Sequence, residues 1–366
     1  MFIEQIDKNV LTKLLQTVIG VVERKQPLPI FSYVLIESNG EELKLIATDS
    51  ELQIEASNLL SSEPFSFTVS AKKFLDILRA LPDDVPLSIK KEEEKLQIKS
   101  KKARFNLQTL PAQNFPKIPE QSNQVGRFEI GQSVLKNLLG MVQYAMAQQN
   151  VRYYLNGMLM IVEGNTLKLV ATDGHRLAFV SAQLEQSYEK IEAIIPRKTI
   201  SELVKLLSSD GENLVTLNFG EKNIRIACGS VTLKTKTIDG KFPDYQRVIP
   251  SYQDYLIINR NDMLAALQRV SILSNEKIPG VRFLLEDNKM HIASSNAEQE
   301  EAEEILDVEF SGAPLDISFN VNYLVDVLHS IPGGNVKLSF GGQNGSLLIT
   351  IPENDDFKYV VMPMRL

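Results

Sequence analysis

Leu45-Ile46-Ala47-Thr48-Asp49 returns 124 residues later as Leu169-Val170-Ala171-Thr172-Asp173, and a fainter copy, His291-Ile292-Ala293-Ser294-Ser295, follows after another 122 residues. Solenoid units repeat every ~20 to 50 residues, so a period of this length matches a whole small domain. The chain of 366 residues holds three such periods. The sequence therefore predicts one fold present three times, with function located where the copies differ.

The same succession of patterns flanks each copy. In the helical windows apolar residues recur at i, i+3, i+4 and i+7, as at Leu11, Leu14 and Leu15. Between the windows apolar and polar residues alternate, as in strands, and turn signals such as Ser38-Asn39-Gly40 bound the runs. Each repeat is thus predicted to run strand, helix, strands, strand, helix, strands. Helices are predicted at 8–19, 71–80, 133–148, 197–207, 260–270 and 320–330, domains at 1–124, 125–253 and 254–366, and joints at 116–126 and 250–254.

Composition limits the class of protein. With 43% hydrophobic and 23% charged residues, the chain is typical of a soluble globular protein long enough for several cores. No apolar run approaches the ~20 residues that span a bilayer, and the start of the chain lacks a signal-peptide pattern. The one cysteine, Cys228, excludes an intrachain disulfide and a cysteine-cluster zinc site. We expect a cytoplasmic protein in which Cys228 sits in a strand core as a small hydrophobe rather than reacts.

The charges are sorted along the chain. The net charge of −7 opposes attraction to a polyanion, but the six helical windows together carry +7 and the remainder −14. Two interpretations are open: the cations solvate outer helix faces, or they contact phosphates. The segments Glu23-Arg24-Lys25 and Gln148 to Tyr154, which follow the first helices of two repeats, favour phosphate contact. Arginine, tyrosine and amide side chains suit phosphate and sugar contacts without base readout.

A search for catalytic chemistry finds one constellation, Thr172-Asp173-Gly174-His175-Arg176. An acid/base pair is one interpretation, but Asp-Gly between extended runs is a hairpin signal, and the first repeat keeps Thr48-Asp49 without the histidine. The segment is therefore predicted to be a turn. Three histidines in separate segments do not predict a metal cluster, and no phosphate-binding glycine loop is present. We expect no catalytic residues, no metal and no cofactor.

Five motifs in order closely resemble one family, the bacterial sliding clamp or beta subunit of DNA polymerase III. The resemblance extends from end to end of the chain, with matching length and triplication. The motifs are Arg152-Tyr153-Tyr154-Leu155-Asn156-Gly157, Ala171-Thr172-Asp173-Gly174-His175-Arg176-Leu177, Asp239-Gly240-Lys241-Phe242-Pro243-Asp244-Tyr245, Ile272-Leu273-Ser274-Asn275-Glu276-Lys277 and Tyr359-Val360-Val361-Met362-Pro363-Met364-Arg365-Leu366.

This resemblance implies an α+β chain of three DNA-clamp domains, with helices lining a central hole, antiparallel sheets outside, and a head-to-tail dimeric ring. Positive helices would hold duplex DNA through its phosphates, without sequence preference and with a strength that falls with salt, so that the ring slides. The protein would act in DNA replication as a processivity factor rather than as an enzyme. An open adaptor of three domains, which binds peptides but never encircles DNA, is the alternative.

The DNA contacts that the resemblance implies come from loops and helix starts. Either Tyr153 or Tyr154 has a second interpretation, as a residue packed in the domain core. The implied contacts are Arg24, Gln149, Arg152, Tyr153, Tyr154, Arg197 and Lys198, to which Lys205 and Arg79 are added.

A groove for partner peptides is implied between the second and third domains. The methionines would let it accept several different peptides, because methionine adapts its shape. Val361 is expected in the last strand, and the 341–346 loop, read as a hairpin turn, is left out of the groove. The implied groove residues are Leu155, Thr172, Gly174, His175, Arg176, Leu177, Pro243, Arg247, Val248, Val360, Met362, Pro363 and Met364. The implied partners are the clamp loader, the replicative polymerase alpha subunit, other DNA polymerases, mismatch-repair proteins and ligase, and no membrane.

The ring joint is implied to join the first domain of one copy to the third domain of the other. A solvated acidic loop explains the glutamates of this set equally well. Because the third repeat has Ala293-Ser294-Ser295 in place of Ala-Thr-Asp, its turn is expected to differ from the other two. The implied joint residues are Lys73, Phe105 and Leu107 on one side and Ile272, Leu273, Glu300, Glu301, Glu303 and Glu304 on the other.

Overall fold

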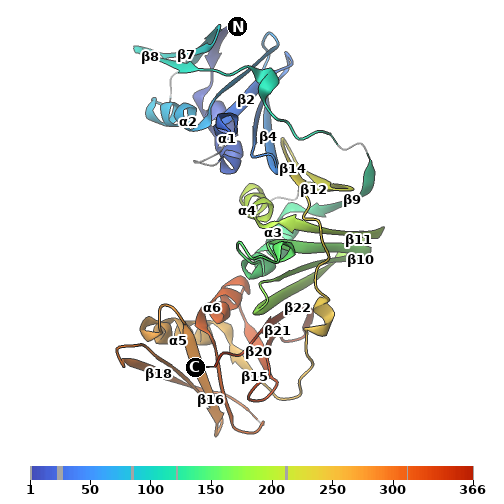
Figure 1. The fold of residues 1–366 in the computed structure, drawn as a ribbon, viewed down its shortest axis with the longest axis vertical. Helices are drawn as coiled ribbons and strands as arrows, with labels where there is room; N and C mark the ends of the chain where they lie inside the picture. Colours follow the sequence, from blue (N-terminus) through green and yellow to red (C-terminus); the bar gives the residue numbers. More distant parts are fainter. Residues whose placement is uncertain are drawn as a thin grey trace. The chain divides into compact units, whose positions relative to one another are not determined.

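The computed structural model describes residues 2–22, 28–83, 86–120, 123–210, 213–310 and 312–365 (Figure 1). Contacts group these residues into two units, 1–134 with 201–237, and 135–200 with 238–366, and each unit is described by itself. No helix in the described part of the chain is long and apolar enough to cross a membrane.

Each described α-helix begins at the predicted residue or one residue from it. Asp7, Asn259 and Asn320 each precede a helix, and each side chain accepts a hydrogen bond from a backbone N–H two residues on, which satisfies a group that the helix leaves open. The apolar stripe predicted for the first helix is buried, with Leu11 and Leu15 almost fully so. The helices are α1 (Lys8–Val18), α2 (Ala71–Ala80), α3 (Gln132–Val142), α4 (Arg197–Leu206), α5 (Arg260–Val270) and α6 (Val321–Ser330).

One helix prediction was wrong at its end. The window 133–148 was expected to be helical throughout, but α3 stops at Val142, whose φ of −127° leaves the helical region. A short 3-10 turn, η4 (Gln143–Ala145), follows, and then a loop. The further 3-10 turns are η1 (Ile19–Val21), η2 (Pro29–Ser32), η3 (Ala112–Asn114), η5 (Tyr153–Leu155), η6 (Tyr245–Arg247) and η7 (Ser271–Leu273).

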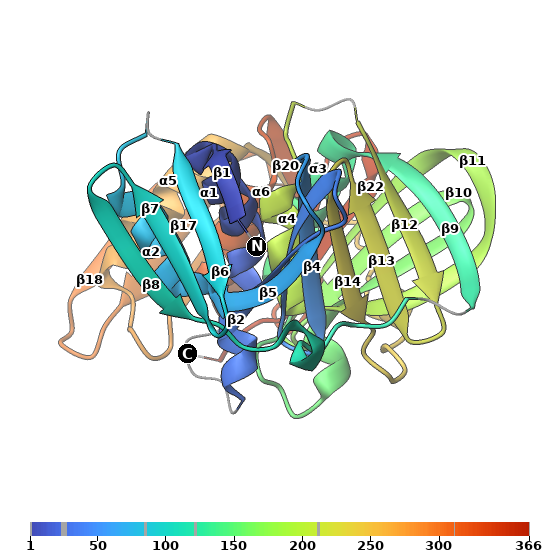
Figure 2. The same cartoon turned by 90° about the horizontal axis from the view of Figure 1, so that it is seen from above.

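The first unit contains two antiparallel sheets. The larger joins strands of the first repeat to strands of the second through pairing of β4 with β14, such as Leu233 opposite Ile54. Figure 2 shows β14, β13, β12 and β9 side by side in this sheet. Its order is β5 (Phe65–Ser70), β2 (Tyr33–Ser38), β3 (Glu42–Thr48), β4 (Leu52–Leu59), β14 (Val231–Lys236), β13 (Asn223–Cys228), β12 (Leu214–Gly220), β9 (Gln124–Gly131). The smaller sheet has the order β1 (Phe2–Ile6), β6 (Leu87–Glu92), β7 (Lys95–Ser100), β8 (Ala103–Gln108).

The second unit has the corresponding pair of antiparallel sheets. Here β11 of the second repeat pairs with β22 of the third, with Leu177 opposite Val360. The larger sheet has the order β10 (Gly157–Thr172), β11 (Arg176–Pro196), β22 (Asn354–Val361), β21 (Leu347–Ile351), β20 (Asn335–Phe340), β15 (Tyr255–Asn259). The smaller has the order β18 (Glu301–Asp307), β17 (Lys289–Ser295), β16 (Gly280–Glu286), β19 (Leu315–Asn320).

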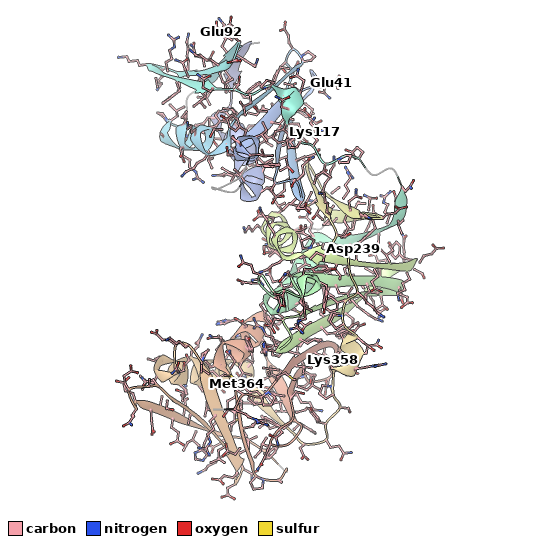
Figure 3. The ribbon with its side chains drawn as sticks, in the orientation of Figure 1. Glu41, Glu92, Lys117, Asp239, Lys358 and Met364 are labelled. Atoms are coloured by element: carbon pink, nitrogen blue, oxygen red, sulfur yellow. The ribbon has the colours of Figure 1, made fainter. Side chains whose placement is uncertain are left out.

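The segment after β8 is tied to the larger sheet of its unit by polar contacts. The backbone N–H of Ile118 donates to the buried side-chain oxygen of Gln53 at 2.7 Å. Lys117, labelled in Figure 3, forms an ion pair with Glu37 at 2.8 Å. Lys234 on β14, nearly buried, pairs with Glu55 at 2.7 Å and also with Glu120. The first residues of the predicted joint at 116–126 are therefore held against the sheet.

Cys228 ends β13 and is half-buried rather than part of the core. Burial raises the pKa of its thiol, which lowers the fraction of reactive thiolate at neutral pH. The expectation of a core position was therefore wrong, because Cys228 stands at the end of its strand and keeps part of its surface exposed.

Candidate functional site

The segment Thr172-Asp173 forms a turn, as predicted. The Thr172 hydroxyl donates to the Arg176 carbonyl at 2.6 Å, and Asp173 Oδ1 accepts from the backbone N–H of His175 at 2.9 Å. The first repeat has the same network: Thr48 donates to the Leu52 carbonyl at 2.9 Å, and Asp49 accepts from the Glu51 N–H at 3.0 Å. Asp173 thus has the same role in its turn as Asp49, which has no histidine beside it, so the pair needs no acid/base explanation.

The third repeat builds its turn differently, which confirms the expectation drawn from Ala293-Ser294-Ser295. Ser294 donates to the Val270 carbonyl at 2.6 Å, away from the turn. Asn296 instead accepts from the backbone N–H groups of Glu298 at 3.1 Å and Glu300 at 3.0 Å. Divergence in sequence therefore changed which residue closes the hairpin.

Arg176 is held by four groups of the second unit. Its guanidinium lies 3.1 Å from Asp173 Oδ2 and 2.6 Å from Asp326 Oδ2, and donates to the Tyr144 carbonyl at 2.7 Å. The Tyr323 ring covers it, with 4.2 Å from Cζ to the ring centroid. Burial opposes the charge on Arg176, but the neighbouring hydrogen bonds and carboxylates raise its pKa above the ordinary value. Arg176 is therefore a permanently charged anchor for the turn.

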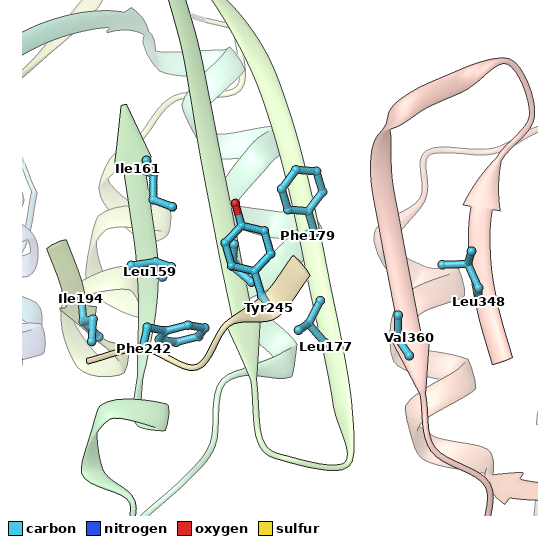
Figure 4. Close-up of a cluster of buried hydrophobic side chains, with 10 residues drawn as sticks. Leu159, Ile161, Leu177, Phe179, Ile194, Phe242, Tyr245, Leu348 and Val360 are labelled. Carbon is cyan, nitrogen blue, oxygen red and sulfur yellow. The ribbon is translucent and has the colours of Figure 1, made fainter. Parts of the chain in front are cut away.

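Beside this turn lies a largely apolar groove of about 230 Å³. Its base belongs to a buried cluster on β10, β11, β21 and β22 together with the segment after β14, shown in Figure 4. Tyr245 of this segment stacks on Phe179 of β11, with ring centroids 5.8 Å apart. The lining residues are Arg152, Leu155, Thr172, Gly174, His175, Arg176, Leu177, Phe242, Pro243, Tyr245, Val248, Val360 and Met362.

The segment 238–252 crosses the larger sheet of the second unit and forms one wall of the groove. Phe242 and Tyr245 are buried against the sheet, whereas Pro243 and Val248 are exposed. Tyr252 is hydrogen-bonded to Ser346 at 3.0 Å and lies so close to Gly341 that a Cβ there would approach its ring to 2.6 Å. The 341–346 loop, a hairpin loop as predicted, therefore supports the segment rather than lining the groove.

Most of the residues expected in a groove lie around this one. Arg247 instead pairs with Asp244 at 2.9 Å, and Pro363 and Met364 follow β22 away from the lining. The Met364 N–H donates to the Ser318 carbonyl at 2.7 Å, on the edge of β19. Val361 ends β22, as expected. The sequence interpretation missed Phe242, Tyr245 and Arg152 as lining residues, although Phe242 and Tyr245 stand in a motif already singled out.

Several of the residues expected to contact DNA lie on the exposed loop that follows η4. Gln149 adopts a positive φ of 51°, and Val151 is 95% exposed. Tyr153 is 56% exposed, while Tyr154 is half-buried and packs against the cluster below the groove. Tyr154 is therefore the tyrosine that packs partly into the domain core, and Tyr153 is the exposed one.

The other expected DNA contacts occupy helices. Arg197, which begins α4, is half-buried and donates to the Met146 carbonyl at 2.7 Å; burial and the charge of Arg176 lower its pKa. Lys198 follows it, half-buried. Lys205 and Arg79 are exposed near the ends of α4 and α2, and Lys205 pairs with Glu202 at 2.7 Å. Arg24 lies outside the described residues.

The residues expected at a ring joint lie on two edge strands and nearby turns. Phe105 and Leu107 are half-buried on β8, the last strand of its sheet, and Lys73 is exposed on α2. Ile272, in η7, is 77% exposed, and Leu273 beside it is half-buried. On β18, also an edge strand, Glu301 is exposed.

The remaining glutamates of the expected joint have partners within the same unit. Glu303 lies 2.9 Å from His291 Nδ1, and Glu304 pairs with Arg269. The side-chain amide of Asn296 donates to Glu300 at 2.6 Å. In the described ranges, no group of three or more histidine, cysteine, aspartate or glutamate side chains is arranged to hold a metal ion.

Comparison with known proteins identifies the family. The family models of the DNA polymerase III beta subunit match residues 1–119 with the N-terminal domain, 129–244 with the central domain and 246–365 with the C-terminal domain. The beta sliding clamp of Pseudomonas aeruginosa is 46% identical over 366 residues, and that of Escherichia coli K12 is 41% identical over 364 residues; each match covers 99% of both chains.

Solved structures agree with these matches. The crystal structure of the DNA polymerase III subunit beta from Pseudomonas aeruginosa has a TM-score of 0.94 at 44% identity, covering 100% of both chains. A sliding clamp from the same species, solved bound to griselimycin, has a TM-score of 0.93 at 44% identity, covering 100% of this chain and 99% of the other. The resemblance and the three repeated clamp domains predicted from sequence are confirmed. The chain therefore belongs to the family of bacterial beta sliding clamps, the beta subunits of DNA polymerase III, and its function is that of a DNA sliding clamp.

Proposed function

We propose that two copies of this chain associate head to tail into a closed ring that encircles duplex DNA and tethers the replicative polymerase. The observation that carries the ring is the complementary character of two edge strands, β8 and β18. Edge strands leave backbone N–H and C=O groups open to pairing with another chain. An interface between different surfaces of two copies closes only if the rotation permits, and a dimer is the smallest ring that it can form.

Charge supports this pairing. Near β8 the exposed side chains include Lys101, Lys102 and Arg104, whereas β18 exposes Glu301 and Asp307. Half-buried apolar residues, such as Phe105 on β8 and Leu306 on β18, would form the centre of the joint. Ile272 would then gain its cover from the neighbouring copy.

The groove would bind short peptide segments of several proteins in turn. Its apolar lining and the half-exposed Met362 suit different apolar side chains, because methionine is flexible and polarizable. We expect the clamp loader, the polymerase alpha subunit, other DNA polymerases, mismatch-repair proteins and ligase to compete for it. We also expect griselimycin, the ligand of two solved relatives, to bind this chain.

DNA would be held through its phosphates and sugars, without base readout. Arg152, Gln149 and Tyr153 are exposed on one loop, and Arg197 and Lys198 begin a helix. Contacts of this kind are sequence-independent and weaken with salt, so retention on DNA would depend on ring closure. Arg24, Tyr154, Lys205 and Arg79 complete the proposed set. The proposal includes domain limits at 1–124, 125–253 and 254–366, a cytoplasmic location, and no catalytic residues of its own.

Topology provides the test. The protein is loaded on nicked circular DNA with a clamp loader and ATP, separated from free protein by gel filtration, and then challenged by cutting the circle once. We expect retention on the circle and release after the cut, because a ring slides off an end. Equal retention on cut and intact DNA would show that contacts rather than encirclement hold the protein, and would contradict the ring.

A further inference from the structure

Asn156, the residue before β10, makes four hydrogen bonds. Its side-chain Oδ1 accepts from the backbone N–H of Asn150 at 2.9 Å, and its Nδ2 donates to the Asn150 carbonyl at 3.0 Å. Its own N–H donates to the Tyr153 carbonyl at 3.0 Å, and its carbonyl accepts from the N–H of Arg197 at 3.0 Å. One asparagine therefore joins the exposed 148–153 loop to the first residue of α4.

The loop has few other supports. The side chain of Asn150 accepts from the Arg152 N–H at 2.9 Å. At the base, the Ala147 N–H donates to the Leu155 carbonyl at 3.0 Å, and the Leu155 N–H donates to the Arg152 carbonyl at 2.9 Å. Val151 at its tip is 95% exposed. Such a loop packs little apolar surface, so its conformation depends on these polar contacts.

The chemistry of the position selects asparagine. The side chain must accept from one backbone group of Asn150 and donate to the other, which a carboxylate cannot do. A hydroxyl is too short to span both groups, and alanine supplies neither bond. Asn156 is half-buried and uncharged, so it has no direct electrostatic attraction for a phosphate.

We propose that Asn156 is a positioning residue for DNA binding: it holds Gln149, Arg152 and Tyr153 in a fixed arrangement relative to Arg197 and Lys198. The inference rests on the proposed function, in which these side chains contact DNA. Fixing the loop before binding removes the entropy cost of ordering it on the DNA. Several phosphates can then be contacted together rather than one at a time.

The test measures how affinity for DNA depends on salt. Fluorescence anisotropy of a labelled linear duplex, titrated with the full chain at several NaCl concentrations, gives the slope of log K against log salt. Each phosphate contact contributes about 0.9 to this slope. We expect Asn156→Ala to weaken binding roughly fivefold at low salt, the factor of about one net hydrogen bond, and to lower the slope although no charge is removed.

Two further variants serve as references. Arg152→Ala removes a proposed contact and should lower both the affinity and the slope. Asn39→Ala removes two side-chain bonds to backbone N–H groups, from Glu41 at 3.0 Å and Glu42 at 2.9 Å, in a turn with no proposed DNA contact. It should lower the melting temperature and leave the slope unchanged, as would any purely structural defect.

The outcomes separate the two proposals. If Arg152→Ala lowers the slope and Asn156→Ala does not, the positioning role of Asn156 is wrong and the DNA surface stands. If neither variant changes the slope, the assigned DNA surface is wrong, and with it the role of Asn156. Should Asn156→Ala fail to fold, Asn150→Ala takes its place, since it removes only the bond to the Arg152 N–H. It must lower the slope by less than Arg152→Ala does, and an unchanged slope overturns the inference.

Discussion

Arg176 Nη1 lies 2.6 Å from Asp326 Oδ2, and the two residues are 150 positions apart in the chain. Arg176 begins β11 at the end of the Thr172 turn, and Asp326 belongs to α6 of the third repeat. The ring of Tyr323, one turn earlier on α6, covers the same guanidinium. The groove wall in the second repeat is therefore fixed by a helix of the third.

Removing this partner should loosen the wall. We expect Asp326→Ala to lower the free energy of unfolding by about 1.5–3 kcal/mol, the range for hydrogen bonds to charged groups, and to weaken peptide binding. Asp316→Ala is the matched control, because the Asp316–Arg282 pair is on the surface and should contribute only ~0–1 kcal/mol. Urea denaturation measures the free energy of unfolding of both variants, and calorimetry measures their peptide binding. Equal losses for the two variants would contradict a special role of Asp326.

Gly174 has a φ of +94°, and an added Cβ would lie 2.5 Å from Arg152 Nη2. Gly174→Ala should therefore cost about 1–3 kcal/mol in backbone strain and also displace Arg152 from the groove. Gly164→Ala is the control: its φ is +60° and nothing lies near the added atom. We expect calorimetry to show weaker griselimycin or peptide binding for Gly174→Ala only. A similar loss in both variants would show that strain alone is responsible.

The C-terminal tail forms a wall of the groove. The Met362 N–H donates to the His175 carbonyl at 2.9 Å, next to the turn. Deleting residues 362–366 should abolish binding of a peptide copied from a clamp-binding segment while leaving the mass in solution unchanged. Deleting only 365–366 keeps Met362 and should preserve binding. Peptide binding by the longer deletion, measured by calorimetry, would show that the groove assignment is wrong.

The proposed ring joint depends on apolar side chains. We expect Ile272→Ala with Leu273→Ala to shift the protein from dimer to monomer, at ~2–5 kcal/mol for each side chain that the joint buries. Leu59→Ala is the control, since Leu59 is 85% exposed and lies outside the proposed joint. Sedimentation at decreasing concentration measures the dissociation. A double variant that remains dimeric at low concentration would exclude these residues from the joint.

A pH dependence follows from the segment tied to the larger sheet of the first unit. The hydrogen bond from Lys234 holds the pKa of Glu120 below its usual 4.5. Because the folded pKa is lowered, the stabilisation is fully present above pH 4.5 and is lost as the pH falls through the lower folded pKa. Wild type should therefore exceed Glu120→Gln in unfolding midpoint near neutral pH, and the difference should vanish in acid. In a Lys234→Met background the difference should be smaller, because only the weaker charges of Arg225 and Lys44 remain near Glu120, and an undiminished difference would contradict the assigned partner.

Local patterns allowed much of the fold to be predicted. The starts of α1, α2, α4 and α5 were predicted at the observed residues, because apolar periodicity is a local property of the chain. The end of α3 was missed because the residues after Val142 continue the apolar pattern although the backbone leaves the helix. The Thr172 turn was predicted because its hydrogen bonds join residues at most four positions apart.

The groove residues were predicted only where a sequence motif of the family contains them. Arg152 was assigned to DNA from its neighbours in sequence, and its position beside Gly174 depends on the loop closed by Asn156. Asp326 carried no signal, since it is one acidic residue on an ordinary amphipathic helix. Neither contact has a local signature.

The sequence by itself determined the triplication, the order of helices and strands, the turns and the family. These depend on short-range hydrogen bonds and on periodic burial, which any segment displays in its own residues. Tertiary structure alone decided that β4 pairs with β14 and β11 with β22, and that Arg152, Phe242 and Tyr245 line the groove. Open strand edges carry the same backbone groups everywhere, so the choice of partner follows from the packing of the whole unit rather than from the strand.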